Sequence, residues 1–173
     1  MKIKTFIPLV LVLLLIAPEA CEKDKVVPAS GTATIDSKLT FNNDLQTYVG
    51  YGFLFSRAKL VSTPGAVAPD ITIYTDGSSV SFMSANYLDS FSLEGSYGDA
   101  ASAGDAFNRL TTVNPALMTW TGLASPLAEG QVWVYRTDQE QYAKIRIIKL
   151  TTGTYESHEY VACNFEWAFQ GDG

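Results

Sequence analysis

Apolar and polar residues alternate along much of the chain with a period of two, which is typical of half-buried β-strands. The clearest run is the last, and it predicts that five residues share one face: Val161, Cys163, Phe165, Trp167 and Phe169. Alanine, asparagine and glutamate occupy the positions between them. A helix would scatter these aromatic side chains around its axis, so the pattern predicts a strand.

Two similar runs precede this strand and predict a C-terminal antiparallel meander. In the nearer run, small and aliphatic residues alternate with basic ones over residues 143–147. In the earlier run, alternation covers residues 132–136, and the polar segment 138–140 connects the two. The segment 151–153 (Thr-Thr-Gly) is expected to form the turn before the last strand.

The first half contains a long apolar run over residues 48–61, in which alternation predicts that four residues share one face: Val49, Tyr51, Phe53 and Phe55. Gly50 and Gly52 lie opposite its aromatic residues. A glycine within a strand is typical of a bend or of a close approach by another backbone segment. We therefore expect one of these at this point.

A hairpin is predicted next, because the apolar runs 71–75 and 78–83 flank the dipeptide Asp76-Gly77. Another strand is expected over residues 88–94. Residues 95–106 are small and polar, and they predict an exposed loop.

Helices are expected only as short segments near residues 42–48 and 105–111. No internal repeat is visible. The pattern therefore predicts an all-β fold, in which residues 32–173 form a single domain of antiparallel sheets with a C-terminal meander.

The N-terminus predicts a targeting signal. Lys2 and Lys4 precede an apolar run over residues 6–17, which is long enough for a signal peptide and too short to span a bilayer. Cys21 follows Ala20 directly and resembles the acylated cysteine of a bacterial lipobox. Residues 1–20 would then be the signal peptide. Ordinary cleavage nearby, which would leave a free Cys21 thiol, is the alternative.

Residues 21–31 are expected to be a lipidated tether that joins the domain to the membrane. Its charged segment 22–25 resembles the tether of surface lipoproteins in the Bacteroidetes. This resemblance implies a lipid-anchored protein of the outer membrane, exposed at the cell surface, with the membrane as partner through acylated Cys21.

Composition narrows the class of protein further. The chain has 173 residues, of which 47% are hydrophobic and 17% charged, so it can bury a core and is not expected to be disordered. Its formal net charge is −6 and it has no basic run. Because phosphate binding needs a local positive field, we expect no nucleic-acid partner.

Catalytic and metal-binding chemistry is poorly represented. His158 is the single histidine and is flanked by acidic residues, as a surface histidine would be. Glu94, Asp99 and Asp105 match no calcium-loop spacing and are expected to be solvated. Cys163 lies in the alternating last run and is expected to be a small buried hydrophobic residue. We expect no enzymatic activity.

One stretch suggests a family. Residues 131–148 resemble the C-terminal part of HmuY-type lipoproteins, in which an aromatic-rich strand ends in Arg-Thr and the next strand begins Tyr-Ala-Lys. The segment 165–169 is similar to the aromatic closing strand of that family. The resemblance covers residues 117–170. It implies an HmuY-like all-β protein of the outer membrane that captures haem and delivers it to a receptor.

The resemblance also implies a haem site. Its best-known members hold the iron between two histidines, whereas His158 lies in the wrong strand for this role. Some relatives look as though they use methionine, which implies Met83 and Met118 as axial ligands here. Nearby aromatic residues would sandwich the porphyrin: Phe82, Tyr87 and Trp120. The alternative is that Met83 fills a gap in the core.

A second function from a different class remains open. The chain could be a non-catalytic surface β-module for glycan or protein interaction. Trp120, Trp133 or nearby tyrosines would then form an exposed aromatic platform.

Overall fold

A computed structural model describes residues 29–86 and 88–170 of the chain. The signal peptide, Cys21 and nearly all of the expected tether lie outside the described residues, as does Tyr87. The described part is mostly β, with antiparallel sheets and one α-helix. In this part of the chain, no helix has the length and apolar character needed to cross a bilayer.

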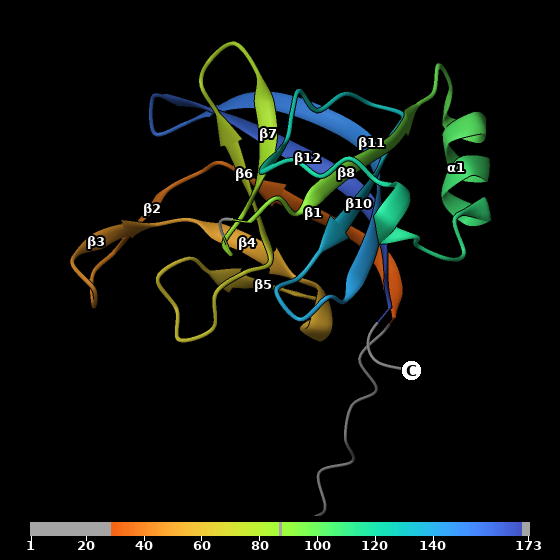
Figure 1. The fold of residues 1–173 in the computed structure, drawn as a ribbon. Coiled ribbons are helices and arrows are strands. Elements are labelled where there is room, and N and C mark those ends of the chain that lie inside the picture. The colour runs from red at the N-terminus through yellow and green to blue at the C-terminus, as the bar shows by residue number, and fades with distance from the viewer. Residues whose placement is uncertain (1–28, 87, 171–173) are drawn as a thin grey trace, which may run out of the picture.

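The first sheet has five antiparallel strands in the order β1-β12-β11-β10-β8. Their bounds are β1 (Ser30–Asp36), β8 (Phe91–Ser96), β10 (Gln131–Arg136), β11 (Tyr142–Tyr155) and β12 (His158–Gln170). Strands β10, β11 and β12 are consecutive in the chain and adjacent in the sheet (Figure 1). The predicted C-terminal meander is therefore confirmed.

The second sheet also has five strands, in the order β5-β4-β6-β7-β9. They are β4 (Tyr51–Leu54), β5 (Lys59–Ser62), β6 (Ile71–Thr75), β7 (Val80–Ser84) and β9 (Leu123–Ala124). The predicted β6–β7 hairpin is confirmed. At its turn, Asp76 Oδ1 accepts backbone hydrogen bonds from Ser78 and Ser79 at 2.9 and 2.8 Å.

The main core lies between these sheets, which pack face to face through aromatic side chains. Phe53 of β4 packs against Phe165 and Trp167 of β12, with ring centroids 5.6 and 5.3 Å apart. Phe82 of β7 also packs against Phe165. The face of β12 predicted from its alternation is confirmed, since Val161, Cys163, Phe165 and Trp167 are buried and Phe169, which is half-buried, packs against the same core.

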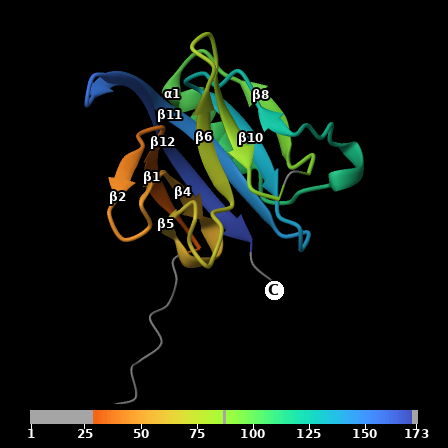
Figure 2. The ribbon, with the colours of Figure 1, turned by 90° about the vertical axis from the view of Figure 1, so that its left-hand side faces the viewer.

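Helix α1 (Ala100–Arg109) covers the outer face of the first sheet and adds a third layer (Figures 1 and 2). The prediction of an exposed loop over residues 95–106 is therefore wrong, and the short helix expected near 105–111 begins earlier. Asp99 caps the helix by accepting a hydrogen bond from Ser102 N, and alanine favours the helical conformation. Lys144 holds the helix to β11 by donating to the Phe107 carbonyl.

The turn predicted at 151–153 is also wrong. Strand β11 continues to Tyr155, and the chain turns at Glu156 and Ser157, both with positive φ. Gly153 lies opposite Tyr160, whose ring occupies the space that a Cβ would need. This glycine therefore makes room for an aromatic ring across the strand pair.

The run 48–61 is broken into several elements. It contains part of β3 (Thr47–Val49), then β4, the 3-10 helix η1 (Phe55–Arg57) and β5. The helix expected at 42–48 is wrong, because β2 (Thr40–Asn42) and β3 form a two-stranded hairpin here. Asn42 Oδ1 accepts backbone hydrogen bonds in its turn. The strand expected over 88–94 begins three residues later, as β8.

The close approach predicted around Gly50 and Gly52 is found at Gly52. A Cβ on Gly52 would lie 2.6 Å from Cβ of Pro69 and would also meet the Ile71 carbonyl. Strand β4 therefore packs directly on the segment that leads into β6.

We expect Gly52→Ala to lower the free energy of unfolding by about 1–3 kcal/mol, because the added methyl group overpacks this contact. Gly98→Ala is the matched control, since a Cβ there meets nothing within 4 Å. Urea denaturation of both variants checks the prediction. Equal stabilities of the two variants would show that β4 can move away at no cost.

Candidate functional site

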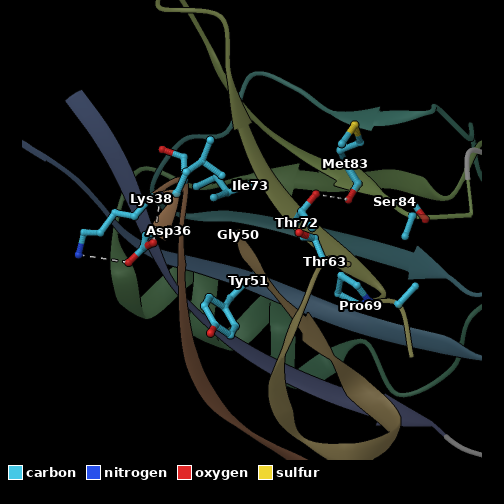
Figure 3. Close-up of a pocket in the computed structure, with 14 residues that line it drawn as sticks. Asp36, Lys38, Gly50, Tyr51, Thr63, Pro69, Thr72, Ile73, Met83 and Ser84 are labelled. Atoms are coloured by element: carbon cyan, nitrogen blue, oxygen red, sulfur yellow. Dashed lines mark hydrogen bonds and ion pairs between the residues drawn. The ribbon is translucent and has the colours of Figure 1, made fainter. Parts of the chain in front are cut away.

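An open cavity of about 340 Å³ lies beside the second sheet and includes Met83 in its lining. We call it the Met83 cavity. Asp36 and Lys38 lie toward one side of it, and Met83 and Ser84 toward the other (Figure 3). Tyr51 adds an aromatic wall. The lining therefore combines a thioether, a phenol and an ion pair.

Strand alternation places the Met83 side chain on this surface. Its neighbour Phe82 is fully buried in the core, whereas Met83 is 38% exposed. Met83 pairs with Thr72 on one side and with Leu123 of β9 on the other. The alternative interpretation, that Met83 fills a gap in the core, is therefore wrong.

Met118 does not line this cavity. It directly follows the 3-10 helix η2 (Pro115–Leu117) and is half-buried. The chain then passes Thr121, which bridges to Phe91, and reaches Leu123 beside Met83. The segment that follows Met118 thus reaches Met83 at Leu123, whereas Met118 itself is not among the residues that line the cavity.

The aromatic residues that were expected to sandwich a porphyrin differ in how exposed their side chains are. Phe82 is fully buried and cannot stack on a ligand in the cavity. Trp120 is half-buried, and the Arg136 guanidinium lies 4.4 Å from the centroid of its ring. The expectation that Trp133 forms part of an exposed platform is wrong, because it is 4% exposed and donates to Gln131 in the core.

One lining residue of the Met83 cavity, Ser84, belongs to a set of polar contacts, and Asp70 follows the lining residue Pro69 in the chain. The Ser84 hydroxyl donates to Asn86 Oδ1 at 2.6 Å and lies 3.3 Å from the Tyr135 hydroxyl. Asp70 accepts a hydrogen bond from Phe55 N at 2.8 Å. Burial of this carboxyl raises its pKa from 3.8 to about 6, although that hydrogen bond opposes the rise. Ser84 is thus held in the lining by polar contacts to Asn86 and Tyr135.

A second hollow of about 410 Å³ shares Ser37, Lys38 and Leu39 with the Met83 cavity. We call it the tyrosine cleft, because three tyrosines line it: Tyr48, Tyr155 and Tyr160. The Lys38 ammonium lies 4.1 Å from the centroid of the Tyr160 ring and 3.3 Å from an Asp36 oxygen. His158, Glu156 and Glu159 complete its polar lining.

Sequence reasoning did not find this cleft. Tyr48 comes from the β2–β3 hairpin, whereas Tyr155 and Tyr160 flank the β11–β12 turn. The available signal was local, namely two tyrosines close to a histidine and two glutamates around residues 155–160. Nothing local indicated that Tyr48 joins them.

The structure also places the other candidate residues, His158, Cys163 and Asp99. His158 begins β12 and is exposed, as expected for a surface histidine. Cys163 is fully buried, and burial raises the pKa of its thiol to about 12, which confirms the prediction of a small buried residue. Asp99 is the N-cap of α1, so this acid has a structural role rather than a place in a loop.

No protein-family model, curated protein or solved structure matches this chain. The functional proposals below therefore depend on the chemistry of the residues and on the resemblance described above.

The Asp70 carboxyl predicts a dependence of stability on pH. Because its pKa is about 6 in the folded chain and ordinarily 3.8 for an aspartate in water, the folded state binds the proton more tightly than the unfolded state. The free energy of unfolding should fall by up to about 3 kcal/mol as the pH rises from about 4 to about 6. Asp70→Asn should remove this fall and be more stable than the wild type at pH 7.

Asp76 provides a control of opposite sign. Hydrogen bonds from Ser78 and Ser79 lower its pKa to about 2, so its contribution to the free energy of unfolding is lost as the pH falls from the ordinary aspartate value of 3.8 toward 2. Asp76→Asn should therefore destabilise the chain at pH 7. Urea denaturation between pH 3 and pH 7 measures both effects, and identical profiles for Asp70→Asn and the wild type would contradict the first.

Proposed function

We propose that the chain is a lipid-anchored, non-catalytic outer-membrane protein of the HmuY-like type, which binds haem or a porphyrin and passes it to a receptor. The observation that carries the proposal is the exposed Met83 thioether on the wall of an open cavity. The resemblance over residues 117–170 supplies the family, and the mostly β fold is consistent with it.

The lining of the Met83 cavity fits such a ligand. A thioether is a soft ligand for haem iron, and Met83 is free to turn toward the cavity because its side chain is outside the core. Tyr51 and Leu39 provide apolar surface for a porphyrin face. Lys38 is the cation in the lining, and a propionate would reach its ammonium by replacing the Asp36 carboxylate 3.3 Å away. The volume lies within the range of small-molecule sites, about 300–1,000 Å³.

The direction of strand β1 is also consistent with a protein that is tethered at its N-terminus. Ser30 pairs with Ala168, whereas Asp36 pairs with Ala162, so β1 runs from the end where the tether would join toward the Met83 cavity. In an anchored protein, the cavity would lie away from the membrane attachment. A ligand or a receptor could then approach it from solvent.

The haem proposal predicts that haemin binds the soluble chain, residues 22–173, at about one haem per chain with a saturating Soret shift. Met83→Ala should weaken this binding at least about tenfold, because it removes the thioether of the cavity. Met118→Ala separately tests the second ligand, and Cys163→Ala is the control for sulfur outside the site. Absence of any Soret shift in both ferric and reduced states would contradict haem binding.

The anchor has its own test. Palmitate labelling of the full chain in a bacterial host should mark the wild type and not Cys21→Ser, since the acyl chains require the lipobox cysteine. Cys163→Ser should still be labelled, because Cys163 is fully buried in the fold. Labelling of Cys21→Ser would contradict the lipoprotein assignment.

The alternative function is a non-catalytic surface β-module for glycan or protein interaction. The tyrosine cleft favours it, since the expected aromatic platform is supplied there by Tyr48, Tyr155 and Tyr160. Tyrosine has an apolar face and a polar hydroxyl and is therefore suited to such contacts.

A further inference from the structure

The tyrosine cleft already holds a cation, which is the ammonium group of Lys38. This group lies 4.1 Å from the centroid of the Tyr160 ring and 5.8 Å from the centroid of the Tyr155 ring. A cation within about 6 Å of a ring centroid is attracted by the negative face of the ring. The cleft therefore offers two aromatic rings to one ammonium group.

Strand register explains why these two rings meet. Gly153 pairs with Tyr160, and Tyr155 is two positions after Gly153, so the side chains of both tyrosines lie on one face of the β11–β12 hairpin. A Cβ on Gly153 would lie 2.8 Å from atoms of the Tyr160 ring, which shows that this ring lies over the glycine. Tyr48 of β3 adds a third ring to the lining, and that ring packs edge-on against Phe41.

We propose that the tyrosine cleft binds an organic cation of the quaternary-ammonium type, such as choline, in the place that the Lys38 ammonium occupies. Aromatic faces arranged around one position are the surroundings that such a cation prefers. The volume of the cleft, about 410 Å³, lies within the range of small-molecule sites.

A carboxylate completes the cation site. Asp36 Oδ2 lies 3.3 Å from Lys38 Nζ (Figure 3). The other oxygen, Asp36 Oδ1, accepts a hydrogen bond from the backbone N–H of Lys38 at 3.1 Å. Because this contact is to the backbone, it holds the carboxylate in position when the lysine side chain moves away. Glu156 and Glu159 add negative charge to the lining and have no ion-pair partner among the described residues.

The Lys38 side chain can leave the cleft at low cost. It is 32% exposed, and an ion pair at such a surface contributes little to stability. A ligand ammonium would then contact both the Tyr160 ring and the Asp36 carboxylate, while the lysine turns to solvent. Lys38 is therefore an internal competitor, and its removal should strengthen the binding of a cation. An anion site would show the opposite effect.

This inference goes beyond haem binding and does not depend on it. Met83 does not line the tyrosine cleft, and Tyr155 does not line the Met83 cavity. Met83→Ala should therefore leave choline binding unchanged, and Tyr155→Ala should leave haemin binding unchanged. Lys38 lines both hollows, so its variant is measured with choline alone.

Isothermal titration of the soluble chain with choline tests the cation site. Choline should bind the wild type with a Kd below about 10 mM. Lys38→Ala should bind it at least about threefold more tightly, because the competing ammonium is gone. Tyr155→Ala and Tyr160→Ala should each weaken binding at least about fivefold, because each removes a ring face. Tyr74→Ala is the matched control, since Tyr74 is 48% exposed but does not line the cleft.

Two further ligands identify what is recognised. Neohexanol, the carbon analogue of choline, has its shape without its charge and should bind at least about tenfold more weakly. Phosphocholine distinguishes the source of the cation: a preference for choline indicates a free ammonium ligand, and a preference for phosphocholine indicates a headgroup that carries the same cation.

Circular dichroism of each variant establishes that it is folded before its affinity is compared. The proposal is overturned if choline binds neither the wild type nor Lys38→Ala, if Lys38→Ala binds choline more weakly than the wild type, or if neohexanol binds as tightly as choline. It is also overturned if Tyr74→Ala weakens binding as much as Tyr155→Ala.

Discussion

Phe53 and Phe55 hold the two sheets together, because their rings pack from β4 and from η1 against the inner face of the first sheet. Phe53 contacts Phe165 and Trp167, and Phe55 contacts Tyr135 and Trp167, with centroid distances of 5.3–5.9 Å. Burial of each such side chain contributes about 1.5–3 kcal/mol, and tilted or edge-on ring pairs add to it. The described chain contains no disulfide, so this aromatic packing carries much of the stability.

The same packing decides which side chains reach the surface hollows. In a strand, the residue beside a buried one must point away from the core. Burial of Phe82 thus turns the Met83 side chain out of the core, and burial of Val161 turns Tyr160 toward the tyrosine cleft. The candidate ligand-binding residues are positioned by core residues that touch no ligand, and a change in register would withdraw them.

The two candidate sites are neighbours with different chemistry. The Met83 cavity offers a methionine, a tyrosine and the Asp36–Lys38 ion pair. The tyrosine cleft offers aromatic rings, carboxylates and hydroxyls. Both include residues 37–39, which directly follow β1. A ligand in one hollow would therefore contact residues that also line the other hollow.

The period of two by itself determined the strands of the C-terminal meander, the β6–β7 hairpin and the buried face of β12, because alternation is a local property that survives without tertiary contacts. Local pattern failed at Gly153 and at residues 95–106: the glycine accommodates the Tyr160 ring across the strand pair, and helix α1 is fixed by side chains of β11. The local pattern also did not predict that Tyr48 lies beside Tyr155 and Tyr160, or that Met118 lies outside the lining of the Met83 cavity. These placements depend on contacts between residues distant in sequence, and only the packing of the two sheets decides them.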